Sequence, residues 1–68
     1  MENPVGILRI IDGNVYLYNT SGQRGRQYYY NGDADRVDFI GEGNVQVQTK
    51  SGKVYLVNNS AQIYKIFN

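Results

Sequence analysis

An eleven-residue segment occurs twice in this chain, at positions 39 residues apart. Residues 13–23 (GNVYLYNTSGQ) and residues 52–62 (GKVYLVNNSAQ) are identical at seven of eleven positions, and a weaker third copy covers residues 43–53 (GNVQVQTKSGK). Within each copy, apolar residues alternate with other residues, which is the pattern of a β-strand with one buried face. Each copy ends in residues typical of turns. The repeat therefore predicts strands joined by tight turns.

The rest of the chain extends this pattern to an all-β fold. No segment keeps apolar residues at i, i+3 and i+4, so no long helix is expected. Asp12-Gly13 favours a type I′ hairpin turn, and Ser51-Gly52 marks a second hairpin. We predict a single domain over residues 1–68, with repeat copies near residues 13–30 and 52–68. Its six to seven short antiparallel strands are expected in a meander, at residues 7–11, 15–19, 27–30, 36–40, 44–49, 53–57 and 63–67.

The spacing of these strands resembles that of β-propeller blades, because a repeat near 39 residues is close to the length of one four-stranded blade. The resemblance is one of spacing, since the sequence contains neither Trp nor His and so lacks the Trp-Asp and Gly-His signatures. Two blades cannot close a ring. We therefore expect either propeller-blade-like sheets completed by oligomerisation or a small closed β-barrel, both of which remove exposed sheet edges.

The short length of the chain also favours self-association. A domain of 68 residues buries only about 60% of its unfolded surface, and such domains commonly add disulfides, a metal or a partner subunit. The chain has no Cys and no His. Asp33, Asp35 and Asp38 lack the further ligands of a calcium-binding loop. We expect no metal and no cofactor, and we expect a homo-oligomer.

The alternation also predicts which side chains form the core and which form a contact surface. The core is expected to contain Val15, Leu17, Val37, Phe39, Val45, Val47, Val54 and Leu56. On the opposite face, Tyr16, Tyr18 and Tyr55 are candidates for a self-association interface, because tyrosine is enriched at interfaces. The alternative is that these tyrosines only pair across strands, since tyrosine has a high β-propensity.

Residues 24–30 (RGRQYYY) carry the candidate ligand site. Arg24 and Arg26 flank a glycine where a loop enters a strand, and alternation places Tyr28 and Tyr30 on one side of that strand. Guanidinium groups bind phosphate, and aromatic rings stack on bases. Arg24, Arg26, Tyr28 and Tyr30 are therefore predicted to bind an anionic aromatic ligand, such as a nucleotide or single-stranded nucleic acid.

A competing interpretation needs no ligand. If Asn31-Gly32 forms a hairpin turn, the two arginines can form surface ion pairs with Asp33, Asp35 or Asp38.

Charge and composition exclude several classes of function. The formal net charge of +1 argues against duplex DNA as a partner. No apolar run reaches the length of a signal peptide or membrane span, and Cys is absent, so we expect no membrane association and a cytoplasmic location. With no His or Cys, the serines have no partner base, so catalysis is not expected.

The sequence therefore predicts a non-enzymatic, self-associating binding module. The alternatives are a structural or protein-interaction assembly module, similar to half a propeller and without a small-molecule ligand, and a glycan-binding module.

Overall fold

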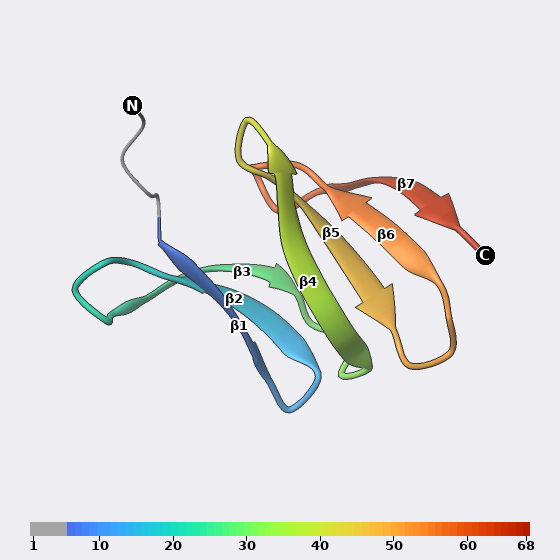
Figure 1. The fold of residues 1–68 in the computed structure, drawn as a ribbon, viewed down its shortest axis with the longest axis horizontal. Coiled ribbons are helices and arrows are strands. Elements are labelled where there is room, and N and C mark those ends of the chain that lie inside the picture. The colour runs from blue at the N-terminus through green and yellow to red at the C-terminus, as the bar shows by residue number, and fades with distance from the viewer. Residues whose placement is uncertain (1–5) are drawn as a thin grey trace.

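The computed structural model describes residues 6–68, which form seven antiparallel strands in two sheets (Figure 1). The N-terminal sheet has the strand order β1-β2-β3, and the C-terminal sheet has the order β4-β5-β6-β7. The strands are β1 (Ile7–Ile11), β2 (Asn14–Tyr18), β3 (Arg24–Tyr29), β4 (Ala34–Gly41), β5 (Asn44–Thr49), β6 (Val54–Val57) and β7 (Ile63–Phe67). The all-β prediction is confirmed, and residues 6–68 contain no helix.

The predicted closed barrel is wrong, and the meander is interrupted once. β3 and β4 belong to different sheets, so Asn31-Gly32 is not a hairpin turn but part of a crossing between sheets. Two hydrogen bonds attach this crossing to the β1–β2 turn: the Ala34 amide donates to the Gly13 carbonyl (2.9 Å), and the Gly32 amide donates to the Asn14 side-chain oxygen (3.0 Å). Because these hydrogen bonds hold residues 32–34 beside the β1–β2 turn, β4 does not pair with β3.

The β1–β2 turn has the predicted geometry. Ile11 pairs with Asn14 across a two-residue loop, and Asp12 and Gly13 have φ values of 53° and 77°. Positive φ at both loop residues is the signature of a type I′ turn. Gly13 is required for a second reason, because a side chain there would overlap the Gly32 backbone.

The turns that end the two repeat copies have the same hydrogen bonds. The side-chain oxygen of Asn19 accepts from the backbone amides of Ser21 (3.0 Å) and Gln23 (2.9 Å). The side-chain oxygen of Asn58 accepts from the amides two and four positions later, both at 2.9 Å. One Asn side chain therefore organises each turn.

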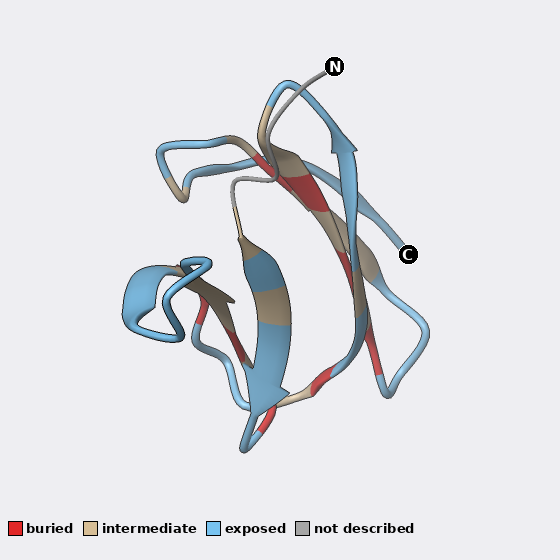
Figure 2. Ribbon diagram, turned by 60° about the vertical axis from the view of Figure 1, so that its left-hand side comes forward, coloured by how far each residue is buried: buried red, intermediate tan, exposed pale blue. Residues whose placement is uncertain are grey.

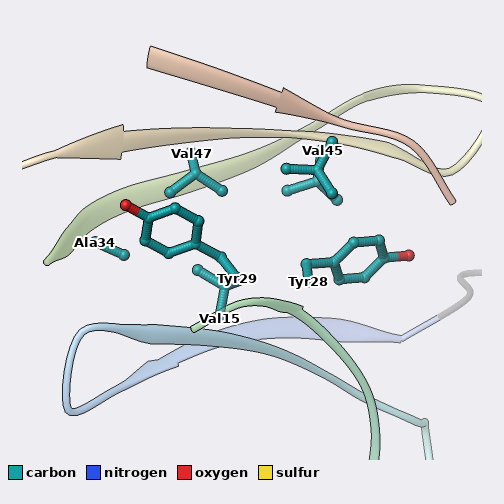
Figure 3. Packing of buried hydrophobic residues seen from close by; sticks show 7 residues of the cluster. Val15, Tyr28, Tyr29, Ala34, Val45 and Val47 are labelled. Atoms are coloured by element: carbon teal, nitrogen blue, oxygen red, sulfur yellow. The ribbon is translucent and has the colours of Figure 1, made fainter. Parts of the chain in front are cut away.

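The core lies between the two sheets, where β4 packs against β1 and β2 (Figures 2 and 3). Figure 3 shows Val15, Tyr28 and Tyr29 directed from the N-terminal sheet toward Val45 and Val47 of β5. The buried apolar residues are Val15, Tyr28, Tyr29, Ala34, Val45, Val47 and Val57. The core positions predicted at 15, 45 and 47 are thus confirmed, and Leu17 and Val37 are partly buried against the same cluster.

The face of β6 that was predicted to be buried is the wrong one. Val47 pairs with Tyr55 and Val45 pairs with Val57, so Tyr55 and Val57 share the inner face of the C-terminal sheet. Val54 and Leu56 consequently lie on its outer face. Two-residue periodicity identifies the residues that share a face, but both faces of β6 are apolar enough to be buried.

Another predicted core residue lies on the expected face but is not buried. Phe39 is on the inner face of β4, opposite Val45, but it remains 40% exposed. It is near the end of its strand, next to the turn that leads into β5.

β3 departs from simple alternation because it contains a bulge. Val15 pairs with Tyr29 and Tyr16 pairs with Gln27, which leaves Tyr28 as an extra residue on β3. A bulge of this kind lets neighbouring side chains point to the same face. Tyr28 and Tyr29 are both buried as a result, with 2% exposure each.

Candidate functional site

The outer face of the N-terminal sheet carries alternating arginine and tyrosine side chains. Arg9 pairs with Tyr16 and Tyr18 pairs with Arg24, so all four side chains share one face. The Arg24 guanidinium carbon lies 4.9 Å from the centre of the Tyr16 ring, and that of Arg9 lies 5.2 Å from the centre of the Tyr18 ring. The Gln27 amide donates to the Tyr16 hydroxyl at 3.2 Å. The result is a cationic, aromatic surface that points away from the core, and we call it the Arg–Tyr face.

Arg26 makes its contacts on another part of β3. Its guanidinium carbon is 5.8 Å from the centre of the Tyr28 ring, and one guanidinium nitrogen donates to the Tyr28 hydroxyl at 3.4 Å. The Tyr28 hydroxyl in turn donates to the Gly43 carbonyl at 3.5 Å. Because Tyr28 is buried, Arg26 is attached to the edge of the core.

The four residues of the predicted ligand site are therefore not equivalent. Arg24 belongs to the outer Arg–Tyr face, whereas Arg26 contacts Tyr28. Tyr28 is buried, but Tyr30 is 69% exposed, so only the second ring is free to stack on a ligand. The bulge at Tyr28 separates two tyrosines that alternation had placed side by side.

The proposed ion pairs of the two arginines are not formed. Among residues 6–68, no carboxylate comes within the 4.0 Å of an ion pair with Arg24 or Arg26. The expected partner carboxylates follow Asn31-Gly32, where the chain crosses to the other sheet instead of returning beside β3. Aromatic rings, rather than acids, neighbour both guanidinium groups.

Tyr55, one of the three predicted interface tyrosines, lies between the two sheets. Its ring centre is 5.4 Å from that of Tyr29, with an angle of 42° between the ring planes. The Tyr29 hydroxyl donates a hydrogen bond to the Asp33 carboxylate. Burial of Tyr29, followed by the effect of this hydrogen bond, raises the pKa of its hydroxyl to about 12. Tyr16 and Tyr18, by contrast, lie on the free outer face.

A hollow of ≈ 290 Å³ lies between the end of β3 and the turn that precedes β7. Its lining is Tyr28, Tyr29, Tyr30, Asn31, Ala61, Gln62 and Ile63. The exposed Tyr30 ring and the amide groups of Asn31 and Gln62 provide one stacking surface and several hydrogen-bonding atoms. This volume is at the lower limit for a small-molecule site.

β7 is an exposed apolar strand at the edge of the C-terminal sheet. All five of its residues are exposed, and four of them, Ile63, Tyr64, Ile66 and Phe67, are large and apolar (Figure 2). Within the described part of the chain, the N-terminal sheet has three strands and leaves this part of the larger sheet uncovered. Exposed apolar edge strands are sites where another chain can add.

Some residues of these surfaces were missed by the sequence analysis. Arg9 and Gln27 join the Arg–Tyr face, and Gln62 and Ile63 complete the hollow. Arg9 carried a usable signal, since it is the one charged residue in an otherwise apolar strand and must point outward. The hollow had no such signal, because it depends on the packing of two distant turns.

Residues 6–68 contain no helix that is long and apolar enough to cross a membrane, and no group of three or more His, Cys, Asp or Glu side chains arranged to hold a metal ion. Comparison of the chain with protein-family models, curated proteins and solved structures gave no match. The functional interpretation therefore depends on the surfaces described above.

Proposed function

We propose that this chain is a non-enzymatic assembly module that associates with copies of itself. The observation that carries the proposal is β7, whose five residues are all exposed although four are large and apolar. Contiguous exposed apolar surface of this kind marks interaction sites. The core is also small, with seven buried apolar residues among residues 6–68, so burial against a second subunit would add stability that one chain has little means to supply.

In this proposal, other copies complete the sheets as successive blades do in a propeller. The registers support the comparison of the two sheets: Tyr18 pairs with Arg24 and Tyr16 with Gln27, while Val57 pairs with Ile63 and Tyr55 with Ile66. These two sets of pairs occupy equivalent positions of the repeat. The N-terminal sheet has no counterpart of β4 within residues 6–68, so it lacks one strand of the repeat.

The mass of the protein in solution tests this proposal. We expect a multiple of the 7.7 kDa chain mass by light scattering or sedimentation equilibrium, and a thermal midpoint that rises with protein concentration. A constant mass of one chain from micromolar to millimolar concentration would rule the proposal out.

A second activity is proposed for the hollow beside Tyr30. An exposed ring next to hydrogen-bonding amides, with Arg26 attached to the neighbouring Tyr28, suits a compound that combines an aromatic ring with negative charge. A nucleotide or a short single-stranded oligonucleotide has this chemistry. Arg24 lies on the outer face at the other end of the strand, so Arg26 is the arginine that this activity involves.

Titration with mono-, di- and cyclic nucleotides and with short oligonucleotides tests this second activity. Binding should weaken about tenfold in Tyr30→Ala, because stacking contributes about 1–3 kcal/mol per base. It should lose most of its salt dependence in Arg26→Ala, whereas Arg24→Ala, on the outer face, should leave that dependence unchanged. Arg36→Ala, which removes an exposed arginine of β4, is the matched control. No binding at millimolar ligand would disprove this activity and leave the assembly proposal intact.

A further inference from the structure

The two sheets pack through unlike faces of the repeat. In the sequence alignment of the two copies, Val15 and Leu17 correspond to Val54 and Leu56. We call these the Val-Leu faces. The Val-Leu face of the N-terminal sheet points into the core, where Val15 is fully buried and Leu17 packs against the cluster. The Val-Leu face of the C-terminal sheet points outward.

The opposite face of the repeat shows the reverse arrangement. Tyr16 and Tyr18 correspond to Tyr55 and Val57, and we call these the Tyr faces. In the C-terminal sheet the Tyr face points into the core, where Val57 is fully buried and Tyr55 contacts Tyr29. In the N-terminal sheet the Tyr face points outward. The core is therefore a contact between the Val-Leu face of the first sheet and the Tyr face of the second.

This head-to-tail packing leaves one face of each kind without a partner. The outer Tyr face is the Arg–Tyr face described above, which carries Tyr16 and Tyr18 together with Arg9 and Arg24. The outer Val-Leu face carries half-buried Val54 and Leu56, to which the register adds Phe67, Lys65, Gln46, Gln48, Arg36 and Asp38. Each free face corresponds in the repeat to a face that the chain itself buries.

We propose that the outer Val-Leu face of one copy binds the outer Tyr face of a second copy, in the same way as the two sheets bind each other within the chain. This inference depends on the proposed self-association and specifies its interface. The contact is heterologous, because the two surfaces that meet are different. Such contacts produce a closed ring when the rotation per copy allows it and an open filament otherwise.

The chemistry of the free faces suits an interface that forms reversibly. By register, Arg24 and Gln27 of the outer Tyr face take the positions that Ile63 and Ile66 have in the C-terminal sheet. The free Tyr face is thus more polar than the Tyr face of the C-terminal sheet, on which Ile63 and Ile66 are exposed. Tyrosine and arginine are the residue types enriched in interfaces between separate subunits. On the opposing face, the Asp38 carboxylate and the side-chain oxygens of Gln46 and Gln48 can accept hydrogen bonds from arginine, and the cations Arg36 and Lys65 lie on the same face.

Complementation between two variants is the decisive experiment. Leu56→Lys places a charge in the Val-Leu face and leaves the Tyr face intact, whereas Tyr18→Lys does the opposite. Each variant alone should associate at least about tenfold more weakly than the parent, because the interface would bury an unpaired charge. Mixed in equal amounts, they should form a heterodimer with twice the chain mass, since each supplies the face that the other lacks.

Ser60→Lys is the matched control for Leu56→Lys, because it introduces the same charge in the C-terminal half of the chain. Ser60 is exposed in the turn between β6 and β7, outside β7 and outside both faces, and its backbone amide, which donates to the Asn58 side chain, is kept in the variant. This variant should keep the mass of the parent. Circular dichroism establishes that each variant retains its β-structure. If Ser60→Lys dissociates the oligomer while Leu56→Lys does not, or if the mixture forms no heterodimer, the proposed interface is wrong.

Cross-linking provides a second test that needs no loss of association. The chain has no Cys, so introduced cysteines are the only thiols. Oxidation of a variant with both Tyr16→Cys and Leu56→Cys should give a ladder of covalent oligomers, and each single variant should stay uncoupled, because a heterologous contact never places a residue beside its own copy. Covalent dimers of the single variants, or no ladder from the double variant while the parent is oligomeric, would overturn this interface alone. A monomeric parent would instead refute the self-association on which it depends.

Discussion

The Tyr29 hydroxyl should make the stability of this protein fall with rising pH above about 10. Tyr29 is 2% exposed, and its hydroxyl donates a hydrogen bond to the Asp33 carboxylate. Burial, then this hydrogen bond and the charge of Asp33, raises the pKa of Tyr29 from 10.0 to about 12. All of these effects favour the neutral phenol in the native state.

The sign and size of the effect follow from proton linkage. Because the native pKa is higher than the unfolded pKa, the stabilisation is fully present below pH 10 and is lost as the pH rises toward 12. At pH 11, a shift from about 10 to about 12 corresponds to at most about 1.4 kcal/mol. Asp33 is only half-buried, so solvent screens its charge, and we expect about 1 kcal/mol.

Urea denaturation of the parent and of Tyr29→Phe at pH 8 and pH 11 measures this contribution. At pH 8 the variant should be about 1–2 kcal/mol less stable, because it lacks the hydrogen bond to a charged acceptor. Between pH 8 and pH 11 the parent should lose about 1 kcal/mol more free energy of unfolding than the variant. Tyr64→Phe, in a half-exposed ring, is the control and should follow the parent. If parent and Tyr29→Phe lose the same free energy over this range, the Tyr29 hydroxyl is not held as described.

Two further pairs of substitutions test the turns, with protein concentration held constant. Asn19→Ala and Asn58→Ala each remove two hydrogen bonds from exposed backbone amides, so each should lower the free energy of unfolding by about 1 kcal/mol. A difference of more than about 2 kcal/mol between the two variants would contradict the shared turn geometry. Gly52→Ala should cost about 1 kcal/mol for its positive φ alone, because nothing surrounds that position. Gly13→Ala should cost about 3 kcal/mol or more, because its new side chain meets the Gly32 backbone. If chemical denaturation shows that Gly13→Ala and Gly52→Ala lose the same free energy of unfolding, the β1–β2 turn does not contact the crossing at Gly32.

The local structure of most of the chain could be predicted from the sequence. The bounds predicted for three strands, at residues 7–11, 44–49 and 63–67, agree with β1, β5 and β7. The Asp12-Gly13 turn was also predicted, because type I′ geometry requires two residues that tolerate positive φ. These features depend on a few adjacent residues, so a single sequence contains the information for them.

The candidate sites could be predicted only in part, because they depend on contacts between segments that are distant in the sequence. The Arg24–Tyr16 pair requires the β2–β3 register, and the hollow requires Tyr30 and Gln62 to approach from different sheets. The bulge at Tyr28 moved one predicted ligand residue into the core.

The sequence alone determined that this protein is built of short strands and, outside the bulged strand β3, which side chains share a strand face, because alternation and turn residues act over a few positions. Only the tertiary structure decided which of the two faces each strand buries. Tyr16 and Tyr55 occupy the same position of the repeat, yet one points outward and the other into the core. The reason is that the two sheets pack head to tail, so the position of a sheet in the stack, rather than its own residues, selects the face that loses contact with water.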